Sequence, residues 1–229
     1  MDSEAVQYRR EIKYVLDPGC YQDVLQAIRM HPAAFSVAYP DRQINNIYFD
    51  SYDYKLFQDS IVGLSNRAKL RYRWYGQSLD PVAGALEVKF RRNAMGSKLV
   101  YPVADLPYVC KQNWQTFTAT LRKTLPFPAQ RWLIDFPQPI LINRYHRVYL
   151  VSADERIRIT LDRNPVLLDQ RHRATPNYSQ KTPMPEGLIM EVKYDAGLDD
   201  VASGIVRHFP FCIGQHSKYT AALSVLSRG

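Results

Sequence analysis

The chain has 229 residues and a formal net charge of +8 at pH 7. Its hydrophobic fraction of 46% and charged fraction of 23% are ordinary for a globular protein and argue against disorder. The positive charge favours an anionic partner, such as a phosphorylated small molecule, polyphosphate, nucleic acid or acidic lipid. The three cysteines lack metal-ligand spacing, and the sequence has neither a secretory signal nor an apolar run of about 18 residues. We therefore expect a cytoplasmic protein with reduced cysteines and no transmembrane segment.

The first part of the chain predicts alternating strands and short helices. We expect a strand, a helix, a second strand and then a short helix or loop, over residues 7–16, 21–30, 44–50 and 52–60. The turn sequence Asp17-Pro18-Gly19 ends the first strand.

Residues 67–91 predict an antiparallel hairpin with a long loop at 76–81. In its first strand, cations occupy every second position, at Arg67, Lys69, Arg71 and Arg73. In its second strand, charged residues alternate with apolar ones, at Glu87, Lys89 and Arg91. Each strand therefore has one charged face and one apolar face.

The rest of the chain also predicts strands, helices and loops. We expect a turn into a shorter strand over 93–103, helical and loop material over 105–137, strands over 139–151, 155–162 and 188–194, a surface loop over 170–185, and helices over 198–208 and from about residue 215. No linker or repeat divides the sequence, so we expect one domain over 1–229.

The mixed alternation recurs in strands far apart in the sequence. Charged or polar residues alternate with apolar ones at Glu11 and Lys13, at Arg156, Arg158, Thr160 and Asp162, and at Glu191 and Lys193. If the charged faces met water, the apolar faces would pack against one another in a sandwich. If the charged faces turned inward, they would line a barrel around water and a polyanion. We favour the second arrangement: an α+β fold in which helices pack outside an eight-stranded antiparallel β-barrel.

The inward faces suit a chain of phosphates. Arg71 and Arg73 stand two residue rises apart, roughly 6.6 Å, which matches adjacent phosphoryl groups. Compact positive charges would be added by Lys13, Lys89, Lys193 and Lys218. Tyrosines interleaved with basic residues leave nucleic-acid binding open at this stage.

Three glutamates, Glu11, Glu87 and Glu191, each precede a lysine by two residues. Each could pair with a lysine across strands, or its carboxylate oxygens could hold Mg²⁺ or Mn²⁺. Because the Glu-x-Lys spacing occurs three times, we favour metal binding. The sequence has no phosphate-binding loop, dinucleotide fingerprint, serine elbow or metalloprotease helix.

Seven short segments follow one another along nearly the whole chain: Tyr-Arg-Arg-Glu-Ile-Lys-Tyr (8–14), Asn-Ile-Tyr-Phe-Asp-Ser (46–51), Lys-Leu-Arg-Tyr-Arg-Trp-Tyr-Gly (69–76), Leu-Glu-Val-Lys (86–89), Arg-Ile-Thr-Leu-Asp (158–162), Met-Glu-Val-Lys-Tyr (190–194) and Ser-Lys-Tyr (217–219). Together they resemble the VTC domain, the polyphosphate polymerase module of the vacuolar transporter chaperone complex. That domain is a branch of the triphosphate tunnel metalloenzymes, or CYTH-like superfamily.

The resemblance implies a tunnel formed by an eight-stranded barrel. It implies transfer of the terminal phosphoryl group of ATP to a growing polyphosphate chain, with Mn²⁺ or Mg²⁺ and without a covalent protein nucleophile. The implied substrate-binding residues are Lys13, Arg71, Arg73, Lys89, Lys98, Arg147, Arg158, Lys193 and Lys218. Of these, the residues implied in catalysis are Arg71, Arg73, Lys89, Arg158 and Lys193. The implied metal ligand is Glu191, supported by Glu87 and Glu11.

One departure from the superfamily pattern bears on the reaction. The hydrolase branch has Glu-x-Glu-x-Lys in its first strand, whereas Arg9 stands here at the first glutamate, before Glu11 and Lys13. This favours the polymerase branch. A metal-dependent triphosphatase acting on inorganic triphosphate or nucleotides, and a non-catalytic polyphosphate-binding domain, are the alternatives. We expect ATP and polyphosphate as partners and no nucleic acid, while the oligomeric state and any separate membrane partner stay open.

Overall fold

The computed structural model describes residues 9–92, 95–106, 113–182 and 187–211. Within these ranges the chain forms a mostly antiparallel sheet with helices on its outside, which confirms the α+β class. The strands are β1 Arg9–Leu16, β2 Ser36–Asp50, β3 Asn66–Tyr75, β4 Gly84–Arg92, β5 Met95–Val103, β6 Gln138–Val151, β7 Ile157–Asp169, β8 Lys181–Thr182 and β9 Leu188–Asp195. The helices are η1 Pro18–Cys20, α1 Tyr21–Arg29, α2 Lys55–Val62, α3 Trp114–Thr124, α4 Phe127–Asp135 and α5 Asp199–Val206.

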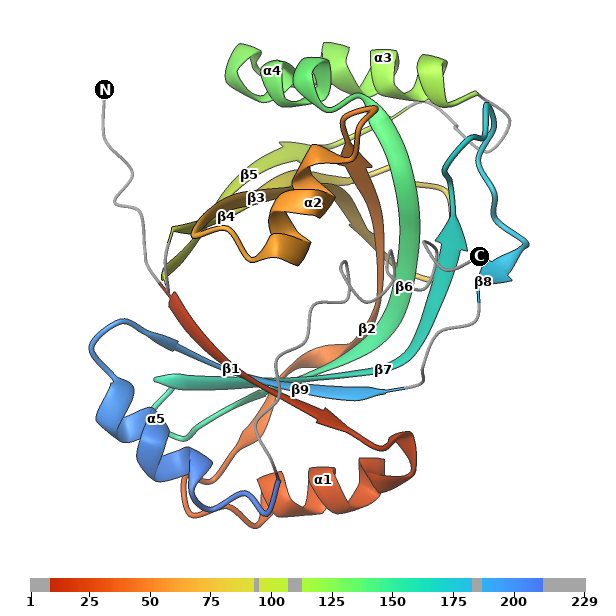
Figure 1. Cartoon of the computed structure of the whole chain (residues 1–229). Coiled ribbons are helices and arrows are strands. Elements are labelled where there is room, and N and C mark those ends of the chain that lie inside the picture. The colour runs from red at the N-terminus through yellow and green to blue at the C-terminus, as the bar shows by residue number, and fades with distance from the viewer. Residues whose placement is uncertain (1–8, 93–94, 107–112, 183–186, 212–229) are drawn as a thin grey trace.

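The sheet curves strongly, so that its first strand, β6, comes back to pair with β7 near the other end. The hydrogen-bonded order is β6-β2-β3-β4-β5-β1-β9-β7-β8, and β6 also pairs with β7 along a long antiparallel ladder. Figure 1 shows β3, β4 and β5 across from β1, β9 and β7, with the long strands β2 and β6 connecting the two sides.

The expected closed barrel of eight strands is not confirmed in that form. In the described residues the sheet has nine strands, because a two-residue strand, β8, adds to the edge of β7. The join between β5 and β1 consists of one residue pair, Arg9 opposite Gly96. A long curved sheet with one narrow join is therefore what positions the site.

Helices cover the apolar outer faces of the sheet. Figure 1 shows α3 and α4 above β3–β5, and α1 and α5 beside β1 and β9. Under α3, Leu70 and Tyr72 of β3 pack in one core cluster with Phe117 and Leu121. Under α1 and α5 a second cluster forms from Tyr14, Val24, Ile28, Val192 and Ala202. Each buried Leu or Phe contributes roughly 1.5–3 kcal/mol of transfer free energy, so these faces fix which side of each strand points inward.

Local sequence explains where α3 begins and ends. The Asn113 side chain accepts a hydrogen bond from the Thr116 amide at 2.7 Å and caps α3. Leu125 ends α3 in an extended conformation, which suits a residue that precedes Pro126.

Several predicted boundaries differ from the observed ones. β2 begins at Ser36 rather than at residue 44, because two register shifts around Tyr39 carry the strand past Pro40 and Asp41. β7 runs to Asp169 rather than to residue 162, and β8 lies within the expected loop. The expected C-terminal helix from about residue 215 lies outside the described residues.

The segment expected as a helix or loop over 52–60 contains α2. The buried Asp50 carboxylate accepts hydrogen bonds from the Leu56 and Phe57 amides at 2.9 and 3.0 Å, which anchors the first turn of α2 to the end of β2. A small apolar cluster including Tyr48, Leu141 and Leu167 packs beside Phe57.

No helix in the described part of the chain has both the length and the apolar character needed to cross a membrane.

Candidate active site

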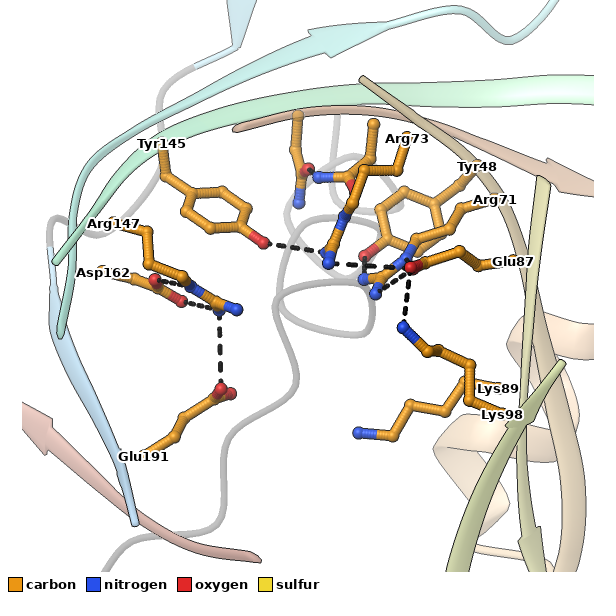
Figure 2. A network of polar contacts seen from close by, with 12 residues as sticks. Tyr48, Arg71, Arg73, Glu87, Lys89, Lys98, Tyr145, Arg147, Asp162 and Glu191 are labelled. Carbon is orange, nitrogen blue, oxygen red and sulfur yellow. Dashed lines mark hydrogen bonds and ion pairs between the residues drawn. The ribbon is translucent and has the colours of Figure 1, made fainter. Parts of the chain in front are cut away.

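Charged side chains from opposite walls of the curved sheet point toward one another across its inner face. Figure 2 shows Arg71 and Arg73 of β3 with Glu87 of β4 on one side, and Arg147 of β6 with Glu191 of β9 on the other. The prediction that the charged faces turn inward is confirmed for these residues. It follows from the alternation, because the intervening residues are buried beneath the outer helices.

Glu87 is the centre of the first group. Its Oε2 accepts from Arg71 Nε at 2.7 Å and lies 2.6 Å from Arg71 Nη2, while its Oε1 accepts from Lys98 Nζ at 2.9 Å. Arg73 Nη1 lies 3.7 Å away. Burial alone would raise the pKa of Glu87, but Arg71, Arg73 and Lys98 together hold that pKa well below its usual range. Glu87 is therefore ionised and fixes the Arg71 guanidinium.

Arg73 is held by neutral acceptors instead. Its Nε donates to Asn46 Oδ1 at 2.8 Å, and its Nη2 donates to the Tyr145 hydroxyl at 3.1 Å. Asn46 is in turn fixed by Asn143, since its Nδ2 donates to Asn143 Oδ1 at 2.7 Å. These neutral partners carry no negative charge, and the Glu87 carboxylate, 3.7 Å from Arg73, is shared with Arg71 and Lys98, so Arg73 is suited to an anionic ligand.

Arg147 has a bidentate carboxylate partner. Its Nε and Nη2 donate to the two oxygens of Asp162 at 2.5 and 2.6 Å, and its guanidinium lies 5.3 Å from the centre of the Tyr145 ring. Burial would lower the pKa of Arg147, but Asp162 raises it well above the usual value. The Arg147 Nη2 also lies 3.5 Å from Glu191 Oε2, which links this arginine to the next group.

Glu11 and Glu191 form a second group with three lysines. Lys13 Nζ lies between them, 2.6 Å from Glu11 Oε1 and 3.0 Å from Glu191 Oε1. Lys193 Nζ lies 2.7 Å from Glu191 Oε2, and Lys89 Nζ lies 3.1 Å from Glu11 Oε2. Burial by itself would lower the pKa of Lys13, but the two glutamates raise it above its usual value. Each glutamate thus pairs with the lysine two residues further on in its own strand and with a lysine of another strand, Lys89 of β4 for Glu11 and Lys13 of β1 for Glu191.

The fit of a divalent cation differs among the three predicted glutamates. In the described ranges, no three His, Cys, Asp or Glu side chains are grouped so as to hold a metal. Both oxygens of all three glutamates are already paired with cations, but Glu191 and Glu11 face each other across Lys13, whereas Glu87 belongs to the other group. Glu11 Oε1 is buried and near Lys13, but is not aligned for a hydrogen bond. Because Mg²⁺ is commonly held by one or two carboxylates plus water and phosphate oxygens, Glu191 with Glu11 fits such an ion better than Glu87 does.

The other predicted ligands lie at the edges of this surface. Lys89 and Lys98 have half-exposed side chains, and Arg158 is exposed and lies opposite Lys193 in the β7–β9 ladder. Lys218 lies outside the described residues.

Sequence reasoning missed several residues that complete the site. Lys69 lies on the inner face of β3, where burial and the nearby charges of Lys13 and Lys89 lower its pKa to about 7. It occupied the alternating pattern but was not chosen as a ligand. The acceptors Asn46, Asp162 and Tyr145 were also missed, although their place on the inward-facing positions of their strands could have indicated them.

Fold and site together define a protein of the triphosphate-tunnel class, with a curved antiparallel sheet lined by arginine, lysine and glutamate. The family model described as VTC domain matches residues 8–227. The chain therefore belongs to the VTC domain family.

Solved structures share the fold. The structure of a proposed adenylate cyclase from Vibrio parahaemolyticus is 12% identical, with a TM-score of 0.56 over 97% of this chain and 99% of that one. The PH1819 protein from Pyrococcus horikoshii OT3 is 9% identical, with a TM-score of 0.52 over 95% and 98% of the two chains. At these identities the likeness concerns the fold alone. Comparison of the sequence with curated proteins gives no match.

Proposed function

We propose that this protein is a cytoplasmic, ATP-dependent polyphosphate polymerase. It would transfer the terminal phosphoryl group of ATP to a polyphosphate chain held along the inner face of the sheet. The observation that carries the proposal is the convergence of Arg71, Arg73 and Arg147 on one interior surface, each with its own acceptor. Membership in the VTC domain family supports it.

The arrangement suits phosphoryl transfer, which requires positioning and charge stabilisation more than covalent chemistry. Two of the guanidiniums are fixed by Glu87 and Asp162, so they need little reorganisation when a phosphate arrives. Arg71 and Arg73, at alternate positions of β3, offer two guanidiniums on one face, whereas a single phosphate would need only one of them. Lys89, Lys193 and Arg158 would extend the row toward both sides of the transferred group.

A divalent cation, Mn²⁺ or Mg²⁺, would be held by Glu191 with Glu11. When bound, it would neutralise charge on the transferred phosphoryl group. Lys13 and Lys193, now paired with these glutamates, would then be released to donate to phosphate oxygens. The glutamates therefore keep the lysines ordered until the anion arrives.

The test is to incubate the purified protein with ATP and Mn²⁺ and to measure the length of the products. Long phosphate chains are expected, and Glu191→Gln should reduce their yield at least about tenfold. Release of orthophosphate alone would instead identify a triphosphatase. Polyphosphate binding without turnover, unchanged in Glu191→Gln, would identify a non-catalytic binder.

A further inference from the structure

Arg67, Lys69, Arg71 and Arg73 form a row of basic side chains along the inner face of β3. An arginine and three tyrosines gather at one end of this cationic row. Arg42 of β2 lies 5.5 Å from the ring centre of Tyr39, 5.6 Å from that of Tyr75 and 6.0 Å from that of Tyr149. The rings of Tyr39 and Tyr149 meet edge to face at 5.7 Å. We call these four residues the tyrosine–arginine cluster. Three strands, β2, β3 and β6, contribute to it.

The cluster continues the inner surface already described. Tyr75 follows Arg73 by two residues on β3, and Tyr149 follows Arg147 by two residues on β6, so each tyrosine shares a face with an inward arginine. Arg42 lies directly opposite Arg147 in the β2–β6 ladder. Burial raises the pKa of Tyr149, and Arg147 and Arg73 are near enough to oppose that rise. The aromatic rings and the phosphate-binding arginines therefore form one continuous surface.

Backbone irregularity aims Arg42 at the rings. The β2–β6 register shifts between Val37 and Tyr39 and again between Tyr39 and Arg42. Such bulges redirect side chains at a sheet edge. They bring Tyr39 and Arg42, which are three residues apart in β2, into contact with each other.

The two ends of the row differ in chemistry. At the far end of β3, Arg67 and Lys69 face the strand partners Arg91 and Lys89 on β4. That end presents four basic side chains, which suit phosphates. The end at Tyr75 presents rings, and Tyr39 and Tyr75 are 51% and 50% exposed. Large aromatic faces beside an arginine are the usual platform for a nucleobase, because every base has a face that can stack.

We propose that the tyrosine–arginine cluster binds the base of the nucleotide substrate. The triphosphate then runs inward past Arg73 and Arg71, and the phosphate chain extends toward Arg67, Lys69 and Arg91. This inference rests on the proposed function, and it adds a direction to it: nucleotide at the aromatic end, polymer at the cationic end. An acceptor chain of phosphate has no base and gains nothing from the tyrosine rings.

The test compares two ligands of similar charge, a non-hydrolysable ATP analogue and inorganic tripolyphosphate, by calorimetry in the presence of Mn²⁺. In the double variant Tyr39→Ala and Tyr75→Ala, affinity for the ATP analogue should fall at least about tenfold, while affinity for tripolyphosphate changes less than about twofold. Arg42→Ala should act in the same direction. Tyr52→Ala, at a tyrosine that is 77% exposed outside the cluster, is the matched control and should change neither affinity.

Unchanged affinity of the double variant for the ATP analogue would overturn the base site, as would an equal loss for both ligands. Either result would leave the triphosphate site intact if the wild-type protein binds tripolyphosphate. A wild-type protein that binds neither ligand would overturn the proposed function as well. Thermal melts of each variant show whether the fold is retained, which is expected since both tyrosines are half exposed.

Discussion

Three arginines on the inner face are held by acceptors that come from neighbouring strands. Arg71 is fixed by Glu87, Arg73 by Asn46 and Arg147 by Asp162. The alternation of charged and apolar residues predicts that the arginines share an inward face. It does not predict their partners, because Asn46 and Arg73 are 27 residues apart and become neighbours only through the β2–β3 register.

Replacing Glu87 with glutamine should destabilise the fold. The substitution leaves Arg71 and Lys98 without their carboxylate, so we expect the free energy of unfolding in urea at pH 7 to fall by about 3 kcal/mol. Asp135→Asn is the matched control. It breaks the exposed pair with Arg131 on α4, which should cost no more than about 0.5 kcal/mol.

The same variant has a pH signature. The pKa of Glu87 is lower in the folded protein than its ordinary value of 4.5, so its contribution to stability is present above pH 4.5 and is lost as the pH falls. The difference between wild type and Glu87→Gln should therefore narrow below pH 4.5. A difference that stays constant down to pH 3 would show that Glu87 acts through packing rather than charge.

Lys69 should take up a proton when a phosphate chain binds. Its pKa is lowered from 10.5 to about 7 by burial and by the neighbouring cations, so at pH 8 most of the lysine is neutral. A polyanion would favour the charged form. Calorimetry of tripolyphosphate binding at pH 8, in buffers of different ionisation enthalpy, should therefore report proton uptake.

Lys69→Met should abolish most of that uptake, whereas Lys123→Met, at an exposed position on α3, should not. The lowered pKa also makes Lys69 destabilising while it is charged. Its effect on stability is therefore relieved as the pH rises from about 7 toward 10.5. Equal proton uptake by wild type and Lys69→Met would exclude this role.

At the scale of elements, hydrophobic periodicity identified the hairpin of β3 and β4, the helices α1 and α5, and the strands β1, β6 and β9 close to their observed bounds. It placed helical material around α3 without bounds. It failed where irregular backbone carries a strand onward. β2 continues through Pro40 because register shifts accommodate residues that a regular strand would exclude. β7 continues to Asp169 because β6 is long enough to pair with it.

The helix α2 depends on a side chain from the preceding strand. Asp50→Ala removes the acceptor of the Leu56 and Phe57 amides, and we expect a loss of about 1–2 kcal/mol. Hydrogen exchange of these two amides should accelerate about tenfold, with smaller changes in α3. Asp50→Asn, which keeps one acceptor oxygen, should lie between the two proteins. Unchanged exchange in Asp50→Ala would mean that packing against β3 alone holds α2.

At the scale of the whole molecule, the sequence predicts a curved sheet whose inner face carries charged side chains. It does not predict which strands pair where the sheet curves back on itself. β6, at one end of the strand order, also pairs with β7, next to the other end, while β5 and β1 share one residue pair. Local alternation contains no information about such joins, since they depend on strand tilt and length. The inward-facing positions were predicted better than the joins of the sheet, because the inward face is a local property of each strand.

The proposed function depends on the interior cations binding linked phosphates. The direct measurement is tripolyphosphate affinity by calorimetry for the wild type, for Arg71→Ala with Arg73→Ala, and for the control Arg29→Ala with Arg131→Ala at exposed helical positions. Two charge-assisted contacts are lost in the first double variant, so its affinity should fall at least about 100-fold. It should keep a cooperative melt, because Lys98 still pairs with Glu87. A folded Arg71→Ala and Arg73→Ala variant that binds tripolyphosphate as tightly as the wild type would contradict the account.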